Sequence, residues 1–213
     1  MSRAVLASLS LAAAATVVSL SPAVSSAPRD TRPLVLHVGD SFVGAGFAPA
    51  LKSRFDKIGV AYKSTAFTAA YTTTLIRQVK LDSLITTLKP RLVIVTIGAN
   101  ELAMPVPEQH AHAVKNITKL ISQVPCVWAL PPRWNDKEAG ILAIMKREAG
   151  PCRVHDPAAI ERDIPRGPDK IHPSDKGGAM WADHFFKWLM AGKAEGQMPW
   201  DPPAAPPEKE AAK

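Results

Sequence analysis

The feature that most constrains the fold is an alternation of short apolar runs with amphipathic stretches along most of the chain. The run Arg91-Leu-Val-Ile-Val-Thr-Ile97 is apolar at nearly every position, which is typical of a strand buried on both faces of a parallel sheet. Strands are predicted at residues 34–39, 60–66, 91–97, 126–130 and 152–156. Helices are predicted at about residues 46–58, 73–88, 107–122, 136–148 and 174–191. The alternation predicts an α/β fold, with right-handed crossovers and helices on both faces of a five-stranded parallel sheet.

Three polar motifs follow the predicted strands, where open parallel sheets form their ligand sites. Gly39-Asp40-Ser41 ends the first run, Gly98-Ala99-Asn100 ends the third, and Asp169-Lys170-Ile171-His172 precedes the last predicted helix. A serine, a histidine with an acid three residues before it, and an amide donor are the groups that acyl transfer requires. We therefore expect these motifs to meet at one edge of the sheet.

Each group in these motifs has a predicted chemical role. Ser41 is the predicted nucleophile, because it lies between a strand end and a helix start, where free N–H groups favour negative charge. His172 is the predicted base, and Asp169 can fix its tautomer through Nδ1. The Ser41 N–H and the Asn100 side-chain amide are predicted donors to a tetrahedral oxyanion. His155, at the end of the fifth run, remains the rival base.

Together the motifs resemble those of the SGNH superfamily, also called the GDSL hydrolases, over about residues 34–190. The matching blocks are Gly39-Asp40-Ser41, Gly98-Ala99-Asn100-Glu101 and Asp169-Lys170-Ile171-His172-Pro173. The resemblance implies a flavodoxin-like three-layer α/β/α sandwich and a carboxylic ester hydrolase that forms an acyl-serine intermediate without a cofactor. It also implies that Ser41 is the nucleophile, that Asn100 is an oxyanion donor and that Asp169 orients His172.

The chain departs from the superfamily's pattern at two positions. The second block usually supplies a glycine N–H to the oxyanion, whereas the matching segment here, Thr65 to Thr72, contains no glycine. Ala69 is the best match, with Ala70 next, and alanine keeps the N–H but resists positive φ. The third block ends in Glu101, where aspartate is usual, which leaves the hydrogen bonding of that loop open.

The loop Pro131-Pro-Arg-Trp-Asn135 follows the fourth run and is expected at the same edge of the sheet. Trp134 offers a flat face to a sugar ring and Arg133 a fork of donors, so both are candidate substrate-binding residues. A structural proline turn explains this loop equally well. The loops contain no long apolar run that would form a lid or an acyl-chain tunnel, which favours a short acyl group, such as acetyl, on a carbohydrate.

The N-terminus predicts export. Met-Ser-Arg and the apolar run from Ala4 to about Val24 are typical of a secretory signal peptide, assigned to residues 1–27, with an uncleaved membrane anchor as the alternative. The hydrolase-like domain is expected at residues 28–193, followed by an extended or disordered tail at residues 194–213 that is rich in Pro, Ala, Lys and Glu. A secreted or periplasmic location is therefore predicted.

Cys126 and Cys152, the two cysteines of the chain, each open a predicted strand after a proline. An even count in an exported chain favours a disulfide. If the two strands are parallel neighbours in equal register, their Cα atoms come close enough for a bridge. Two buried thiols are the alternative.

Charge and spacing exclude several classes of protein. The formal net charge of +7 comes from scattered basic residues, without the basic and aromatic cluster of a nucleic-acid site. No spacing predicts a metal site. The predicted partner is a small acyl ester or an acylated glycan, without stable membrane insertion after signal cleavage. Two alternatives stay open: an envelope polysaccharide O-acyltransferase, and a catalytically weak envelope-binding domain on the same scaffold.

Overall fold

The computed structural model describes residues 30–136 and 138–202, so the predicted signal peptide and the end of the predicted tail lie outside the described residues. The strands are β1 (Leu34–Gly39), β2 (Ala61–Ala66), β3 (Leu92–Thr96), β4 (Cys126–Ala129) and β5 (Arg153–His155). The helices are α1 (Ala48–Lys57), α2 (Thr72–Val79), α3 (Leu81–Leu88), α4 (Ala111–Ile121), α5 (Ile141–Glu148) and α6 (Asp175–Met190). Three short turns are η1 (Val43–Phe47), η2 (Pro107–His110) and η3 (Glu161–Asp163).

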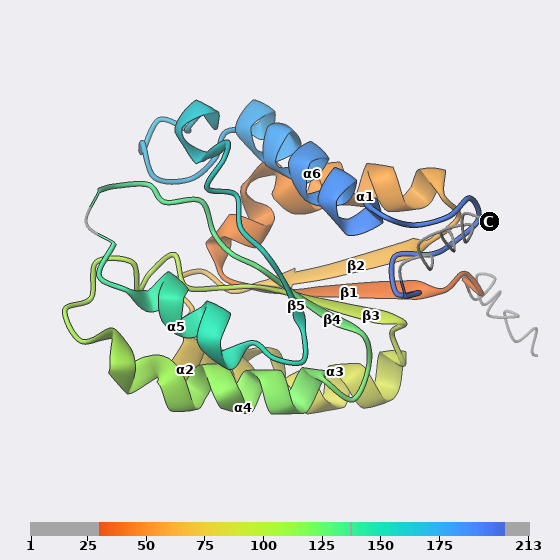
Figure 1. Ribbon diagram of the computed structural model, residues 1–213, viewed down its shortest axis with the longest axis horizontal. Helices are drawn as coiled ribbons and strands as arrows, with labels where there is room; N and C mark the ends of the chain where they lie inside the picture. The colour runs from red at the N-terminus through yellow and green to blue at the C-terminus, as the bar shows by residue number, and fades with distance from the viewer. Residues whose placement is uncertain (1–29, 137, 203–213) are drawn as a thin grey trace, which may run out of the picture. The chain divides into compact units, whose positions relative to one another are not determined.

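The five strands form one parallel sheet in the order β2-β1-β3-β4-β5. Helices α1 and α6 cover one face, and α2 to α5 cover the other (Figure 1). The predicted α/β/α sandwich with a five-stranded parallel sheet is therefore confirmed. The chain reverses its direction of winding between β1 and β3, so their carboxyl ends flank the point where such sheets form a ligand crevice.

The buried residues form one apolar cluster on each face of the sheet. All five residues of β3 are buried, which explains its nearly uniform apolar sequence. On β1, Leu36 packs into the cluster under α2 to α5, whereas Val35 packs into the cluster under α1 and α6. In the second cluster Phe47 and Trp181 stack with ring centroids 3.7 Å apart. Burial of each such side chain stabilises the fold by about 1.5–3 kcal/mol.

Two predicted helices differ from the observed ones because of local backbone geometry. The predicted helix at residues 73–88 is two helices, since Lys80 between α2 and α3 has φ 48°, in the left-handed region. Lysine is a good helix former, so the sequence carries no signal for this break. The helix predicted from residue 136 begins only at Ile141, because Gly140 has φ 109°.

Cys126 and Cys152 form the expected disulfide, with their Cα atoms 4.8 Å apart. The register is the expected one, because β4 and β5 are neighbours and Val127 pairs with Arg153, one residue beyond each cysteine. The bridge joins the amino ends of the two strands. It therefore lies at the edge of the sheet opposite the carboxyl ends that carry Ser41 and Asn100.

The segment at residues 194–202 differs from the extended or disordered tail that composition predicts. Met198 and Trp200 pack against the apolar cluster under α1 and α6. The Asp201 carboxylate accepts a hydrogen bond from the Met198 N–H at 2.7 Å. The apolar side chains of Met198 and Trp200, with the cation–π contact of Arg91 on the Trp200 ring, thus hold this proline-rich stretch on the domain. Along residues 30–136 and 138–202, no helix is both long and apolar enough to cross a membrane.

Candidate active site

Ser41, His172 and Asp169 form a chain of hydrogen bonds at the carboxyl edge of the sheet. Ser41 Oγ lies 2.7 Å from His172 Nε2, and His172 Nδ1 lies 2.6 Å from Asp169 Oδ2. These are the distances of a hydroxyl within reach of a base that an acid orients. The arrangement allows the imidazole to take a proton from Ser41 and to hold it beside a carboxylate.

A tight turn places Asp169 under the imidazole. Asp169 Oδ1 accepts hydrogen bonds from the N–H groups of Ile171 and His172, at 2.9 and 3.0 Å. Lys170, at φ 61°, allows the turn to close. The hydrogen bond with the His172 side chain, followed by the backbone N–H bonds, lowers the pKa of Asp169 to about 2. The carboxylate is therefore ionised at neutral pH, as the orienting acid of such a chain must be.

Close packing brings the His172 loop to Ser41. A Cβ on Gly178, in the first turns of α6, would lie 2.3 Å from the carbonyl carbon of Gly46, so only glycine permits this approach to η1. The Phe42 ring packs against the His172 imidazole, with centroids 5.1 Å apart. The approach of Gly178 to Gly46 and the Phe42–His172 ring contact thus fix the turn that carries Ser41 against the loop that carries His172.

Asp40 joins the turn after β1 to the loop after β3. Its buried carboxyl accepts hydrogen bonds from the Phe42 N–H at 2.9 Å and the Ala99 N–H at 3.3 Å. Burial and, to a smaller extent, the nearby Glu101 carboxyl outweigh the lowering effect of the N–H donors and raise the pKa of Asp40 to about 7. Asp40 is therefore a structural link between the loops that carry Ser41 and Asn100.

The predicted oxyanion donors Ala69 and Asn100 lie on adjacent loops. Ala69 has φ 54°, the left-handed conformation that favours glycine, so alanine here adopts the backbone that the superfamily's glycine would adopt. Ala69 is exposed, and its N–H donates to no acceptor in the described part of the chain. Asn100 Nδ2 donates to the Ala70 carbonyl at 2.8 Å, which uses one of its two N–H bonds. No described residue accepts the other N–H.

Glu101, the second departure from the superfamily's pattern, ties the Ala69 segment to the loop after β3. Its buried carboxylate accepts a hydrogen bond from the Thr72 N–H at 2.6 Å, at the start of α2. The Thr72 hydroxyl lies 2.9 Å from His110 Nδ1, which is itself 3.8 Å from Glu101 Oε1. Burial raises the pKa of Glu101 and lowers that of His110. Sequence reasoning missed Thr72 and His110, and its one signal was the unusual glutamate.

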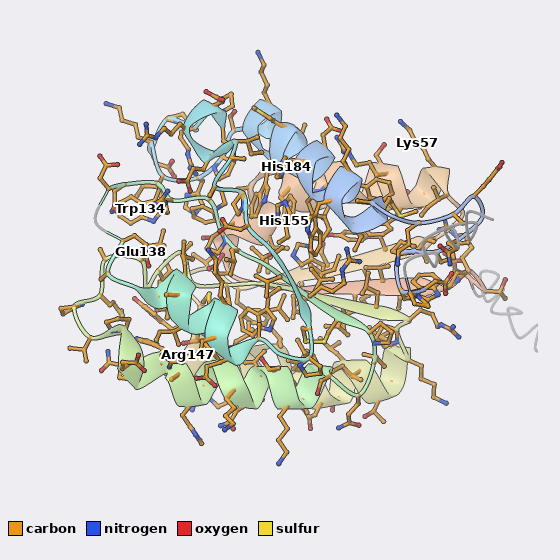
Figure 2. All side chains as sticks on the ribbon, viewed as in Figure 1. Lys57, Trp134, Glu138, Arg147, His155 and His184 are labelled. Carbon is orange, nitrogen blue, oxygen red and sulfur yellow. A yellow bond between two sulfur atoms is a disulfide. The ribbon has the colours of Figure 1, made fainter. Side chains whose placement is uncertain are left out.

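The structure brings His172, and not the rival His155, to Ser41. His155 is fully buried, and its Nε2 lies 2.8 Å from His184 Nδ1 on α6 (Figure 2). Burial, followed by the proximity of His184, lowers the pKa of His155 to about 3. His155 is therefore a neutral residue of the packed interior, like His37 on β1, which is also buried.

Arg133 and Trp134 lie on the loop after β4, at the carboxyl edge of the sheet. Figure 2 labels Trp134 on this loop. Trp134 Nε1 donates to the Ala99 carbonyl at 3.1 Å. Arg133 Nε and Nη2 both donate to Glu161 Oε1, with the Nε contact at 2.7 Å, so part of its fork of donors is already occupied. These residues line a cavity of about 290 Å³, together with Arg166 and Ile164.

In the described ranges, no group of three or more His, Cys, Asp or Glu side chains is placed to hold a metal ion.

Comparisons with known proteins find similarity in the fold. No protein-family model matches the chain. No curated protein matches its sequence. Among solved structures, the chain is similar to an acetyl xylan esterase, AlAXEase, with a TM-score of 0.61 and 14% identity over 73% of this chain and 98% of that one.

Two further solved structures show the same likeness. A lipase/acylhydrolase from Enterococcus faecalis has a TM-score of 0.61 and 15% identity, over 74% of this chain and 95% of that one. The esterase EstA from Pseudoalteromonas sp. has a TM-score of 0.57 and 17% identity, over 73% and 98%. The resemblance to the SGNH hydrolases is thus confirmed as a likeness of fold.

Proposed function

We propose that this chain is an ester hydrolase of the SGNH type that acts through an acyl-Ser41 intermediate. The observation that carries the proposal is the Ser41–His172–Asp169 chain, with its contacts of 2.7 and 2.6 Å. Neither packing nor stability requires a hydroxyl, an imidazole and an ionised carboxylate to be hydrogen-bonded one to the next at the carboxyl edge of the sheet, where ligands bind. The esterases and acylhydrolases that share the fold make this chemistry the natural reading of the three groups.

The geometry supports a two-step acyl transfer. His172 Nε2 takes the proton of Ser41 as Oγ bonds to the acyl carbon, and the carbonyl electrons move onto oxygen. The oxyanion is held by the Ala69 N–H, the free N–H of Asn100 and the Ser41 N–H. The ester C–O bond then breaks, and His172 returns the proton to the leaving alcohol. Water repeats the sequence on the acyl-enzyme and releases the acid.

The proposed substrate carries a short acyl group, such as acetyl, on a carbohydrate. Trp134 is half-exposed at the rim, where its flat face suits a sugar ring better than a fatty chain. One of the proteins that share the fold is described as an acetyl xylan esterase. The proposed location is secreted or periplasmic, and the Cys126–Cys152 disulfide supports it, because disulfides persist in oxidising compartments.

Two alternatives to a hydrolase were an envelope polysaccharide O-acyltransferase and a catalytically weak envelope-binding domain. The second of these loses its main support. That alternative depends on the missing glycine, yet Ala69 adopts the conformation that the glycine would provide. An O-acyltransferase would share the acyl-Ser41 intermediate and differ only in the acceptor. Product that forms only when a sugar acceptor is present would identify it.

The test is turnover of a series of soluble esters, from acetyl to octanoyl, by the purified protein and by Ser41→Ala. Ser53→Ala, which removes an exposed hydroxyl on α1, is the matched control. We expect wild-type and control activity to be highest with acetyl and to fall with each added methylene, and we expect Ser41→Ala to be inactive. Undiminished activity in Ser41→Ala would refute the mechanism. An optimum at eight carbons or more would refute the short-acyl assignment alone.

A further inference from the structure

We propose that the cavity beside the catalytic loop binds a carboxylate group of the substrate, so that this enzyme acts on an acidic glycan. The inference rests on the proposed ester hydrolysis and adds the class of sugar to it. The cavity lies between the loop after β4 and the segment that contains η3. It is lined by Arg133, Trp134, Asn135, Asp136, Glu161, Arg162, Ile164 and Arg166.

The cavity is attached to the residues that would carry out the reaction. Arg166 Nη1 donates to the Ile171 carbonyl at 2.9 Å, one residue before His172. On the other side, Trp134 Nε1 donates to the Ala99 carbonyl at 3.1 Å, one residue before Asn100. Because the two walls are hydrogen-bonded to the loops that carry His172 and Asn100, the cavity adjoins the proposed site, and we place a second group of the same substrate in it.

Among the described residues, two of the three arginines in this cavity, Arg162 and Arg166, form no ion pair or hydrogen bond with a carboxylate, although Glu161 and Asp169 lie near enough to Arg166 to influence its charge. Glu161 is committed to Arg133, through the guanidinium and through the Arg133 N–H at 3.3 Å. Arg166 donates only to neutral carbonyl oxygens within the described chain, those of Ile171 and Arg133. Arg162 is exposed and makes no ion pair with any residue that the structure describes.

Arg166 is the better-placed of the two cations. It is half-buried, so its charge is only partly solvated; burial lowers the pKa of its guanidinium, against the raising effect of the nearby Glu161 and Asp169 carboxylates. A partly desolvated guanidinium whose hydrogen bonds go only to carbonyl oxygens gains a charge-assisted hydrogen bond from a carboxylate that reaches it. Arginine presents a planar fork that matches a planar carboxylate at two points, and the adjacent Trp134 can support a sugar ring. The cavity of about 290 Å³ is at the small end of ligand sites, which suits one ring.

The experiment compares two acetylated sugars that differ only at C6, an acetylated methyl glucuronoside and the matching acetylated methyl glucoside. We expect kcat/KM to be about tenfold higher for the acidic sugar, the effect of one charge-assisted hydrogen bond. This preference should shrink as salt is added, because the arginines lie near solvent. The acetylated glucoside 6-phosphate is the third substrate, and a preference for it over the glucuronoside would overturn the carboxylate assignment.

Variants identify the residues responsible through the ratio of kcat/KM for the acidic and neutral sugars. We expect this ratio to fall at least threefold in Arg166→Gln and in Arg162→Gln, and to stay at the wild-type value in Arg77→Gln, which removes an exposed charge on α2. The use of a ratio cancels any general effect of Arg166→Gln on the His172 loop. Equal kcat/KM for the acidic and neutral sugars, or an unchanged ratio in both variants, would overturn this inference and leave the ester hydrolase intact. Absence of turnover with all three sugars, and with the simple esters, would instead refute the proposed function.

Discussion

Glu101 accepts a hydrogen bond from the backbone N–H of Thr72 at 2.6 Å, across 29 positions of sequence. This contact joins the loop that carries Asn100 to the first residue of α2, three residues after Ala69. An aspartate, which is usual at this position in the superfamily that the chain resembles, is one methylene shorter. We therefore relate the chain's two departures from the superfamily's pattern to each other. Ala69 strains the backbone of its segment through its positive φ, and the longer side chain of Glu101 holds that segment in place through Thr72.

Replacing Glu101 tests this relationship. Glu101→Asp should lower kcat about tenfold with a smaller change in KM, because a misplaced Ala69 N–H weakens a donor that acts on the transition state. Glu101→Gln keeps the acceptor oxygen at the same reach and should retain most of kcat. Steady-state kinetics on an acetyl ester give both constants. Equal losses in the two variants would show that the carboxylate's charge, and not its reach, is what matters.

Ala69→Gly should relieve the strain at φ 54° without removing the N–H. A left-handed conformation costs an L-residue about 1–2 kcal/mol, which exceeds the extra unfolded-state entropy of glycine. We expect the free energy of unfolding to rise by up to about 1 kcal/mol, with kcat preserved. In this background Glu101→Asp should lose less activity than it does alone. Urea denaturation and kinetics check both parts, and a clear loss of stability in Ala69→Gly would contradict the account.

Asp40 should make the protein less stable as pH rises from about 4 to about 7. Its pKa is raised from 3.8 to about 7, so the folded state keeps the proton while the unfolded chain releases it. Below about pH 4 the carboxyl is protonated in both states and imposes no penalty. Between the two pKa values the penalty grows by at most about 1.4 kcal/mol per pH unit, and above pH 7 it is constant.

The measurement is the difference in unfolding free energy between wild type and Asp40→Asn, from urea titrations at several pH values. Asparagine keeps an acceptor for the Phe42 N–H and cannot ionise. The other titrating groups are common to both proteins, so wild type should lose stability relative to the variant only across pH 4 to 7. A pH-independent difference would show that Asp40 is ionised in the folded state.

Reduction of the Cys126–Cys152 bridge should lower stability without abolishing turnover. The bridge closes a loop with a sequence separation of 26, so the chain-entropy model gives about 3–4 kcal/mol. It lies at the amino ends of β4 and β5, away from Ser41 and His172. Urea denaturation of the Cys126→Ala/Cys152→Ala variant, with assays at a temperature where it stays folded, separates the two effects. Loss of kcat in the folded variant would contradict this placement.

The sheet and the triad were predictable for different physical reasons. Strands buried on both faces, such as β3, must be apolar along their length, so their order and spacing are visible in the sequence. The hydrogen bonds of Asp169 are local, since its partners lie two and three residues away. Ser41 could be assigned to the same edge as His172, 131 positions away, only because both follow strands of one parallel sheet.

The remaining features depend on contacts that a sequence does not encode locally. Glu101 contacts Thr72 and His110 because η2 packs beside α2, and nothing in the sequence spacing of these residues predicts the contact. Arg133 was predicted to offer its fork of donors to a substrate, whereas Glu161 of η3 occupies part of that fork. Composition also predicted an extended or disordered tail at residues 194–213, whereas Trp200 packs on the domain.

The most direct test of the central claim is to identify the residue that becomes covalently modified. A phosphonate ester that reacts with activated hydroxyls should add one equivalent to the protein, and peptide mass mapping should place the adduct on Ser41. His172→Ala should slow labelling by several orders of magnitude, since the base that takes the Ser41 proton is absent. Ser53 serves as the internal control and should stay unmodified. Stoichiometric labelling of any residue other than Ser41, or undiminished labelling in His172→Ala, would contradict the proposed mechanism.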